Sequence, residues 1–596
     1  MIAALRLLPV LLTAGLAACA TVQGPSDMPA MPAFDSQRSS DHRGADDLLT
    51  AGLGLDGLRA PAPLAFADPA RPTPAELRRR ALWSNWRGIA DLAPGGGYGA
   101  LYGSVAPVPG REFHAYATVP GARHPHRVLA QVPDAFDHAR RCLVVAASSG
   151  SRGVYGAIAV AGAWGLPRGC AVAYTDKGAG SDYYDLDAGL AVGADGTVGG
   201  AGPAFRPDAT GAAGGVAFKH AHSRDHPEAD WGRHVEQAAM FGLQALSRAF
   251  PDRAPFAPGN TRILAVGISN GGGAVLRAAE DGDWLDAVVA GEPNVHAAGA
   301  RPLYDVATEA ALLMPCALPA LGLPAMPYAA ARCAALRGAG LVEGADLPAQ
   351  QASALARLRA SGWSEAALRA GAASVGFDLW RAVAAAYAQA YGRRGPERPL
   401  CGYGYAALAA DGAARPATEA ERAAWWSDAS GIPPGAGVAL LDGLAGEGPD
   451  PAWPGLRCLR ALWEGGDEAS GQVRAAIAAT RAAPPRAGLP VLVVHGLDDG
   501  LVPEVHTSAP YVAAARAAGR AIGYWQVENA QHFDAFLGLP GYAGAYVPLL
   551  PYVYAALDRV DAHLSGQAVP PGDARVRARP RAAGEALEAR HLALPE

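Results

Sequence analysis

Charged residues and cysteines are both scarce in this chain of 596 residues. Only 18% of the residues are charged, the formal net charge is -6, and no stretch gathers lysine and arginine into a basic stripe. We therefore expect no nucleic-acid partner, because nucleic acids are bound through clustered positive charge. The seven cysteines form no CxxC pair and no Cys/His spacing typical of a zinc site, so we expect no metal and no other cofactor. Half of the residues are hydrophobic, which indicates a globular protein with at least one large core.

The first 19 residues have the pattern of a secretory signal peptide. Arg6 precedes an apolar run from Leu7 to Leu16, which is too short to span a membrane. The run ends in Leu16-Ala17-Ala18-Cys19, a sequence like the processing site of a lipoprotein. We expect an exported protein and favour a lipid that anchors Cys19 to a membrane, with ordinary cleavage nearby as the alternative. Residues 20–45, rich in Ser, Asp, Pro and Met, predict a flexible leader.

Six cysteines remain when Cys19 is set aside. An even number in an exported chain favours disulfides, although sequence alone leaves their connectivity open. The alternative is that several of them are buried thiols. Pairing of neighbours along the chain is the simplest arrangement, and it gives Cys142–Cys170, Cys316–Cys333 and Cys401–Cys458.

The stretch around Ser269 indicates a nucleophile. An apolar run from Ile263 to Val266 predicts a buried strand, and the run from Gly272 to Glu280 predicts a helix. Between them, Gly267-x-Ser269-x-Gly271 matches the G-x-S-x-G elbow of α/β-hydrolases. In such an elbow the serine occupies a strained turn at the sheet edge, and a Cβ at either flanking position would collide with the strand or the helix. An ordinary glycine-rich turn is the alternative, but the strand before and the helix after favour the catalytic interpretation.

The remaining pattern predicts an α/β-hydrolase core with a mostly parallel sheet and a large, mainly helical inserted cap domain. The apolar runs 142–147, 170–176, 285–291 and 489–494 predict parallel strands, and the alternating segment 112–132 predicts antiparallel edge strands. Residues 301–484 are Ala-rich with helical periodicity at 347–360, 364–372 and 377–391, and no strand of comparable quality interrupts them. We therefore place the core in residues 46–300 and 485–566, the cap in 301–484, and a Pro/Arg-rich tail in 567–596 that wraps the surface or is disordered.

A serine hydroxyl needs an imidazole to accept its proton and a carboxylate to orient that imidazole. In α/β-hydrolases the acid and then the base follow the serine along the chain, and the sequence offers Asp499 and His532 in that order. Asp499 follows a predicted strand and His532 follows the next one, so both lie at carboxyl ends of strands. Asp498 and Glu292 are alternative acids, and we expect His495 to be structural.

A small-residue loop, 148–153, follows the strand 142–147. We expect an oxyanion hole that combines the backbone N–H of Asn270 with one from Ser149 or Gly150. His220, His222, Asp225, His226 and His234 could be interpreted as a metal cluster. Their spacing fits no common metal signature, and we favour an exposed histidine-rich loop.

Several motifs outside the elbow are unusual enough to indicate a family. They are Trp83-Ser84-Asn85-Trp86-Arg87, Gly97-Tyr98-Gly99-Ala100-Leu101-Tyr102-Gly103, Tyr174-Thr175-Asp176-Lys177-Gly178, Lys219-His220-Ala221-His222-Ser223, Gly267 to Gly273 with Arg277-Ala278-Ala279-Glu280, and Gly291-Glu292-Pro293-Asn294. With these motifs, over most of its length, the chain resembles the D-(−)-3-hydroxybutyrate oligomer hydrolases. The resemblance implies an exported serine esterase that acts downstream of polyhydroxybutyrate depolymerase and cleaves 3-hydroxybutyrate oligomers to monomers, with Ser269 as the nucleophile.

Two other functions remain open. An exported esterase of the tannase or feruloyl-esterase kind would share the elbow, the disulfides and the inserted domain, and would prefer aromatic esters. A catalytically inactive surface lipoprotein that binds a ligand in a hydrolase-like pocket would have no need of Ser269, Asp499 and His532 together. The residues alone do not choose a substrate or an oligomeric state.

Overall fold

The computed structural model of the protein describes Met1 and residues 33–595, apart from 181, 211, 213 and 429–436. The predicted signal peptide with Cys19, and the first part of the predicted leader, lie outside the described residues. No helix among the described residues is long and apolar enough to cross a membrane.

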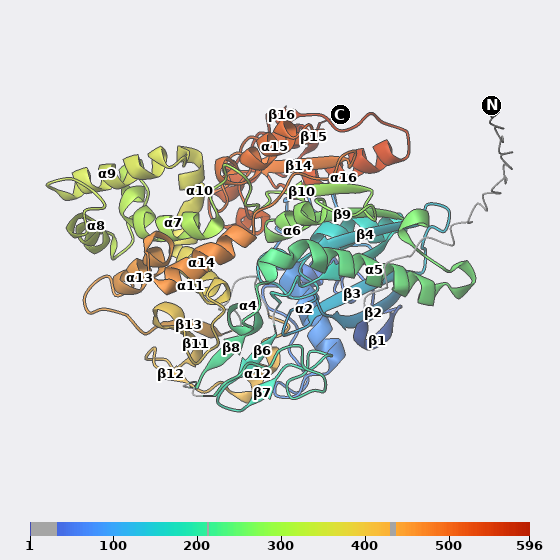
Figure 1. Ribbon diagram of the computed structural model, residues 1–596, viewed down its shortest axis with the longest axis horizontal. Helices are drawn as coiled ribbons and strands as arrows, with labels where there is room; N and C mark the ends of the chain where they lie inside the picture. The colour runs from blue at the N-terminus through green and yellow to red at the C-terminus, as the bar shows by residue number, and fades with distance from the viewer. Residues whose placement is uncertain (2–32, 181, 211, 213, 429–436, 596) are drawn as a thin grey trace. The chain divides into compact units, whose positions relative to one another are not determined.

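A ten-stranded sheet runs through the described chain (Figure 1). Its spatial order is β1 (Phe34–His42), β2 (Gly110–Ala117), β3 (His126–Pro133), β5 (Ala171–Thr175), β4 (Cys142–Ala147), β9 (Arg262–Ile268), β10 (Ala287–Gly291), β14 (Val491–Gly496), β15 (Ile522–Val527) and β16 (Ala574–Val576). Neighbouring strands from β5 to β16 are parallel, whereas β1, β2 and β3 pair antiparallel at one end. The sheet is mostly parallel, and with the helices on its faces it has the predicted α/β-hydrolase fold.

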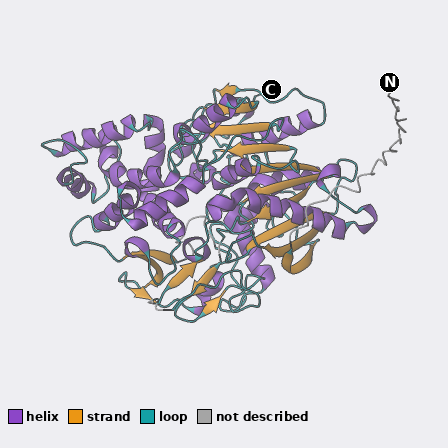
Figure 2. Ribbon diagram, in the orientation of Figure 1, coloured by secondary structure: helices purple, strands orange, loops and turns teal. Residues whose placement is uncertain are grey.

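Helices cover both faces of this sheet, as Figure 2 shows. One face packs against α5 (Trp231–Ala249), α6 (Asn270–Ala278) and α15 (Ser508–Ala517), and the other against α2 (Pro74–Arg87) and α16 (Leu550–Leu564). Successive side chains of β4 alternate between the two cores, with Leu143 and Val145 in one and Val144 and Ala146 in the other. Because both faces are buried, the strand is a continuous apolar run.

The strand order reverses between β4 and β9, and this reversal positions the site. From β4 the chain continues to β5 on one side, whereas the later parallel strands β9, β10, β14 and β15 extend the sheet on the other side. Loops that leave the carboxyl ends of β4 and β9 therefore diverge to opposite faces and leave a crevice, which is where ligands bind in open α/β sheets.

The insertion between β10 and β14 is mainly helical and has a hydrophobic core of its own. Its helices are α7 (Leu303–Ala317), α8 (Ala329–Gly338), α9 (Leu347–Ala360), α10 (Glu365–Gly376), α11 (Leu379–Tyr391), α12 (Glu419–Ala424), α13 (Trp453–Glu464) and α14 (Glu468–Ala479). The expectation that no strand interrupts it is wrong, because β11 (Tyr403–Leu408), β12 (Ala414–Arg415) and β13 (Val438–Asp442) form a three-stranded sheet.

A second small sheet, formed by β6 (Tyr183–Asp185), β7 (Leu190–Ala191) and β8 (Val216–Phe218), belongs to the core half of the chain. It packs against the sheet of the insertion. Phe218 and Tyr405 lie with ring centroids 4.8 Å apart, and Arg422 contacts Asp185 at 2.9 Å. These strands are too short to show an alternating pattern in the sequence.

At the chain ends, the prediction of a flexible leader is wrong for residues 34–42, and of the two alternatives for the tail the disordered one is excluded. The predicted leader 20–45 includes β1, which pairs with β2 through Phe34 to His42. The tail is not disordered, because β16 pairs with β15 and α17 (Ala589–Leu592) packs on the core, where the Leu592 carbonyl accepts a hydrogen bond from the Tyr552 hydroxyl at 2.6 Å. Both strands contain polar residues, with Ser, Asp and Arg in β1 and Arg in β16, so their composition is that of flexible segments and pairing with a neighbouring strand is what orders them.

The structure confirms the three predicted disulfides, Cys142–Cys170, Cys316–Cys333 and Cys401–Cys458. The first joins the starts of neighbouring strands of the sheet, and the other two lie in the insertion. Their sequence separations are 28, 17 and 57 residues.

Removal of the disulfide that closes the longest of these loops should destabilise the protein most. For Cys401→Ala with Cys458→Ala we expect the free energy of unfolding to fall by about 4 kcal/mol, compared with about 3 kcal/mol for Cys316→Ala with Cys333→Ala, because a longer loop constrains the unfolded chain more. Denaturant unfolding under oxidising conditions measures both values. A larger loss for the shorter loop would contradict this ranking.

Candidate active site

Ser269 lies in the sharp turn between β9 and α6. Its φ of 54° and ψ of -125° are strained for a residue with a side chain. A Cβ at Gly267 would lie 2.2 Å from the carbonyl oxygen of Gly271, and one at Gly271 would lie 2.4 Å from the carbonyl oxygen of Ala147. Only glycine therefore allows strand, turn and helix to approach this closely, as the elbow motif requires.

A chain of hydrogen bonds joins Ser269, His532 and Asp499. The His532 Nε2 lies 3.0 Å from the Ser269 Oγ, and the His532 Nδ1 lies 2.7 Å from the Asp499 Oδ2. The other oxygen of Asp499 accepts hydrogen bonds from the backbone N–H groups of Leu501 and Val502, at 2.8 and 2.7 Å. The structure thus brings together the three residues that the sequence predicts.

The environment keeps Asp499 ionised. Burial alone would raise the pKa of this carboxyl, but the charge of His532 and hydrogen bonds from His495 and His532 outweigh burial and hold the pKa below its usual range. His495 is fully buried. Its Nε2 donates to the Val502 carbonyl at 3.0 Å and lies 3.3 Å from the Asp499 Oδ2, and its Nδ1 pairs with the Ser508 hydroxyl at 2.7 Å. His495 thus supports the acid from behind, away from Ser269.

The two alternative acids do not contact His532 in the described part of the chain. The backbone N–H of Asp498 donates to the Ala530 carbonyl at 3.0 Å, and burial raises the pKa of its half-buried carboxyl to about 6. Glu292 is buried beside the site at a φ of 28°. Burial, together with the charges of Asp534 and Asp499, raises the Glu292 pKa well above its usual range.

The loop after β4 presents donors for an oxyanion. Ser149 and Gly150 line the same pocket as Ser269. Within the described residues, the backbone N–H groups of Ser149, Gly150 and Asn270 have no acceptor of their own. The Asn270 side chain is held between the Tyr387 hydroxyl at 2.7 Å and the Asn294 amide at 2.8 Å, which fixes the start of α6.

Two buried side chains that the sequence analysis did not assign hold this loop. The Lys177 Nζ donates to the Ser148 Oγ at 3.0 Å and to the Gly150 carbonyl. The His220 Nδ1 pairs with the Ser151 Oγ at 2.7 Å, and its Nε2 pairs with Glu228 at 2.5 Å. Both residues belong to the motifs on which the family resemblance depends, 174–178 and 219–223, so those motifs were the available signal.

The prediction of an exposed histidine-rich loop is wrong. His220, His222, His226 and His234 are all buried, and α4 (Lys219–His222) packs against α11 of the insertion. Among the described residues, no group of three His, Cys, Asp or Glu side chains is placed to hold a metal ion. Their hydrogen bonds explain the burial. For example, the His222 Nδ1 accepts from the Phe218 backbone N–H at 3.2 Å.

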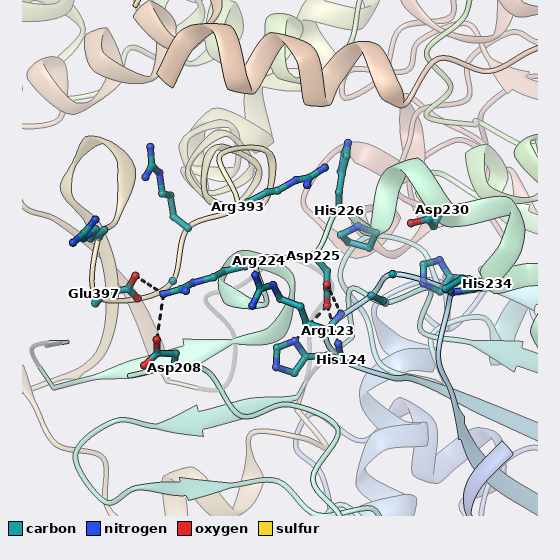
Figure 3. Close-up of a pocket in the computed structure, with 18 of the residues that line it drawn as sticks. Arg123, His124, Asp208, Arg224, Asp225, His226, Asp230, His234, Arg393 and Glu397 are labelled. Carbon is teal, nitrogen blue, oxygen red and sulfur yellow. Dashed lines mark hydrogen bonds and ion pairs between the residues drawn. The ribbon is translucent and has the colours of Figure 1, made fainter. Parts of the chain in front are cut away.

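His226 and His234 line a separate cavity of about 870 Å³, shown in Figure 3. Arg224 crosses it to contact Glu397 at 2.5 Å and Asp208 at 3.9 Å, and Asp225 accepts from the backbone N–H groups of Arg123 and His124. This cavity shares no lining residue with the pocket at Ser269.

The pocket at Ser269 has a volume of about 530 Å³. The core contributes one wall, and the insertion contributes Phe377 and Leu379 at the other. The remaining lining combines apolar side chains with four ionisable ones. The apolar ones include Ile268, Phe533, Ala535, Phe536, Leu550 and Val553, and the ionisable ones are Arg87, Arg152, Glu292 and Asp534. Such a pocket can enclose a short ester with apolar substituents and exclude water from the serine.

Comparison with known proteins identifies the family to which the chain belongs. A family model described as 3HB-oligomer hydrolase matches residues 15–594. The chain belongs to the 3HB-oligomer hydrolase family. It is 38% identical over 632 residues to the D-(-)-3-hydroxybutyrate oligomer hydrolase of Paracidovorax citrulli, which covers 92% of this chain and 89% of the relative. It is 39% identical over 631 residues to the enzyme of that name from Burkholderia vietnamiensis, which covers 92% and 90% of the two chains.

Two solved structures are also similar to this member of the 3HB-oligomer hydrolase family. Feruloyl esterase B from Aspergillus oryzae has a TM-score of 0.37 and 11% identity, over 78% of this chain and 82% of that one. Tannin acyl hydrolase from Aspergillus niger has a TM-score of 0.35 and 12% identity, over 92% and 86% of the two chains.

Replacing Lys177 tests its hold on the loop. For Lys177→Met we expect a fall in kcat of about 10²-fold, because the donors of the oxyanion hole are displaced.

Burial lowers the Lys177 pKa to about 7, whereas an unfolded lysine keeps its proton to about pH 10.4. From pH 7 to 10 the unfolded state therefore binds the extra proton, and the free energy of unfolding of the parent should rise, relative to the variant, by up to about 1.4 kcal/mol per pH unit. Unfolding curves that run parallel at pH 7, 8 and 9 would contradict a buried lysine of lowered pKa.

Glu292 offers a matched pair of substitutions. Burial raises the Glu292 pKa well above its usual range and so favours the neutral carboxyl. Glu292→Gln imitates that form in charge and shape, and kcat/KM should stay within a few-fold of the parent between pH 6 and 8. Glu292→Ala removes the side chain from the pocket wall and should lower kcat/KM clearly. If the Gln variant lost as much activity as the Ala variant, an ionised Glu292 would be required instead.

Proposed function

We propose that this protein is a serine esterase that hydrolyses D-3-hydroxybutyrate oligomers to monomers. The observation that carries the proposal is the hydrogen-bonded line of Ser269, His532 and Asp499 at the bottom of an apolar pocket, in a chain that belongs to a family of oligomer hydrolases. The reaction needs no cofactor, because the groups that move protons and hold charge are all side chains and backbone N–H groups.

The reaction proceeds through an acyl-enzyme. The Ser269 Oγ attacks the ester carbonyl while the His532 Nε2 takes its proton, and Asp499 stabilises the imidazolium that forms. The backbone N–H groups of Asn270 and of Ser149 or Gly150 hold the negative charge on the tetrahedral intermediate. The alcohol of one hydroxybutyrate unit then leaves with the proton of His532. Water, activated by the same histidine, releases the acyl unit and restores Ser269.

We also propose that the protein works outside the cytoplasm, on soluble products of a polyhydroxybutyrate depolymerase. The three disulfides support an oxidising compartment. The pattern of residues 1–19 supports export, with Cys19 as the site of a lipid anchor.

The first experiment measures monomer release from the D-3-hydroxybutyrate dimer and trimer by protein that lacks residues 1–19. We expect release by the parent and a loss of at least about 10³-fold in Ser269→Ala. Release from methyl ferulate or a gallate ester, with none from the oligomers, would replace the proposed substrate by an aromatic ester.

The two adjacent aspartates give a matched test of the acid. Asp499→Asn should lower kcat by about 10⁴-fold, because the amide no longer fixes the histidine tautomer. Asp498→Asn should stay within a few-fold of the parent, since Asp498 does not contact His532. Equal losses in the two variants, measured on the dimer, would contradict the assignment of Asp499.

A further inference from the structure

Arg152 is a buried cation in the wall of the pocket at Ser269. It is 6% exposed and lines this pocket together with Ser149 and Gly150. Its Nη2 donates to the Gly88 carbonyl at 3.0 Å, and its Nη1 is buried without a hydrogen-bond partner in the described residues. No carboxylate of the described chain lies within 4.0 Å of the guanidinium, since no ion pair involves Arg152.

Arg152 differs in this respect from the other buried arginines. The described residues include five arginines of this kind, at 78, 127, 152, 332 and 581. The other four contact carboxylates, Arg78 with Glu112, Arg127 with Asp182, Arg332 with Asp450 and Arg581 with Asp91. A buried charge without a partner destabilises a fold strongly. Among the described residues, each of these buried guanidinium groups has a carboxylate partner except that of Arg152.

Three carboxyl groups lie in or beside this pocket, Glu292 and Asp534 in its lining and Asp499 against His532. Asp499 is engaged by His532, and Asp534 accepts hydrogen bonds from the backbone N–H groups of Leu549 and Leu550. Burial, with the charges of Asp534 and Asp499, raises the pKa of Glu292 well above its usual range and so favours its neutral form. Burial lowers the pKa of Arg152 only to about 10, so the guanidinium is still charged at neutral pH.

We propose that Arg152 binds the terminal carboxylate of the substrate, and so restricts cleavage to the carboxyl end of an oligomer. The proposal rests on the proposed function. In such an oligomer only two carbons, the methine and the methylene of the last unit, separate the scissile ester oxygen from the terminal carboxylate. The last unit is therefore short enough for Arg152 to hold its carboxylate while the ester carbonyl lies at Ser149 and Gly150, which belong to the same loop as Arg152.

This geometry also defines the products. The last unit leaves as free 3-hydroxybutyrate, and the rest of the chain stays on Ser269 until water releases it. Each cycle then shortens the oligomer by one unit and creates a new terminal carboxylate for the next cycle. Internal esters of the polymer and neutral esters lack this group, so the free energy gained at Arg152 is not available to them.

The test compares one substrate in two charge states. D-3-hydroxybutyrate dimer and its methyl ester share the scissile bond and differ only in the terminal carboxylate. We expect the parent to prefer the free acid. Arg152→Gln should lower kcat/KM for the acid at least about 30-fold, mainly through KM, and should change kcat/KM for the methyl ester by less than threefold. Arg152→Lys, which keeps the charge without the planar fork, should recover part of the preference.

Two further measurements separate a role in binding from a role in folding. Because Arg152→Gln removes an uncompensated buried charge, its Tm should equal or exceed that of the parent. Arg393→Gln, a change of an exposed arginine in the separate cavity of Figure 3, should leave the preference for the acid unchanged. Equal losses on the acid and the ester in Arg152→Gln would overturn the proposal and assign Arg152 to the loop structure.

A failure of the proposed function would look different. In that case the parent itself would hydrolyse neither dimer, whatever residue stands at 152. The same comparison can then be made by calorimetry with Ser269→Ala and D-3-hydroxybutyrate alone. Binding of this carboxylate that Arg152→Gln weakens at least about tenfold would support the site, and binding that the substitution does not change would overturn it.

Discussion

The reversal of strand order between β4 and β9 is the constraint on which the rest of the site depends. Because the chain leaves these two strands toward opposite sides, the elbow of Ser269 and the loop at 148–153 face each other across one crevice. The acid and the base then arrive from β14 and β15, the later strands on the Ser269 side, at the same carboxyl edge. Four segments that are far apart in the sequence therefore supply one reaction centre.

Two buried basic side chains belong to the loop beside this centre or contact it. Arg152 is part of the loop at 148–153 and Lys177 donates to it, and neither forms an ion pair among the described residues. They serve different purposes. Lys177 donates to acceptors of the loop and keeps its shape, whereas Arg152 lines the pocket and its Nη1 has no hydrogen-bond partner among the described residues.

The sequence predicts those parts of the molecule whose pattern is local. Parallel strands such as Cys142–Ala147 are continuous apolar runs, and the helix at 347–360 has helical periodicity, so both appear in the structure with the predicted bounds. The elbow was predictable because its glycines are required by contacts within a few residues. Asp499 was predictable as the acid because it follows an apolar strand and precedes the histidine, and the structure places it against His532.

What could not be predicted depends on partners that are distant in the chain. His220 lies in a segment with the sequence of a solvated loop, and its pairing with Ser151 and Glu228 explains why it is buried. β1 and β16 are polar segments that become strands because the neighbouring strands β2 and β15 offer free edges. The lack of a partner for Arg152 is likewise a property of the packed fold and is not visible in the sequence.

The placement of β1 and β16 at opposite edges of one sheet has a consequence for how the protein matures. The sheet begins with Phe34 and is complete only when Val576 has joined it, with the insertion threaded between β10 and β14. A nascent chain therefore cannot close its main core until nearly all of it has been synthesised, and such non-local pairing is slow to form. Each disulfide, by contrast, spans 57 residues or fewer, so its cysteines can meet within a segment as that segment emerges. The disulfides can thus form before the sheet is complete. A chain that crosses a membrane unfolded would already contain these local crosslinks when β16 pairs with β15.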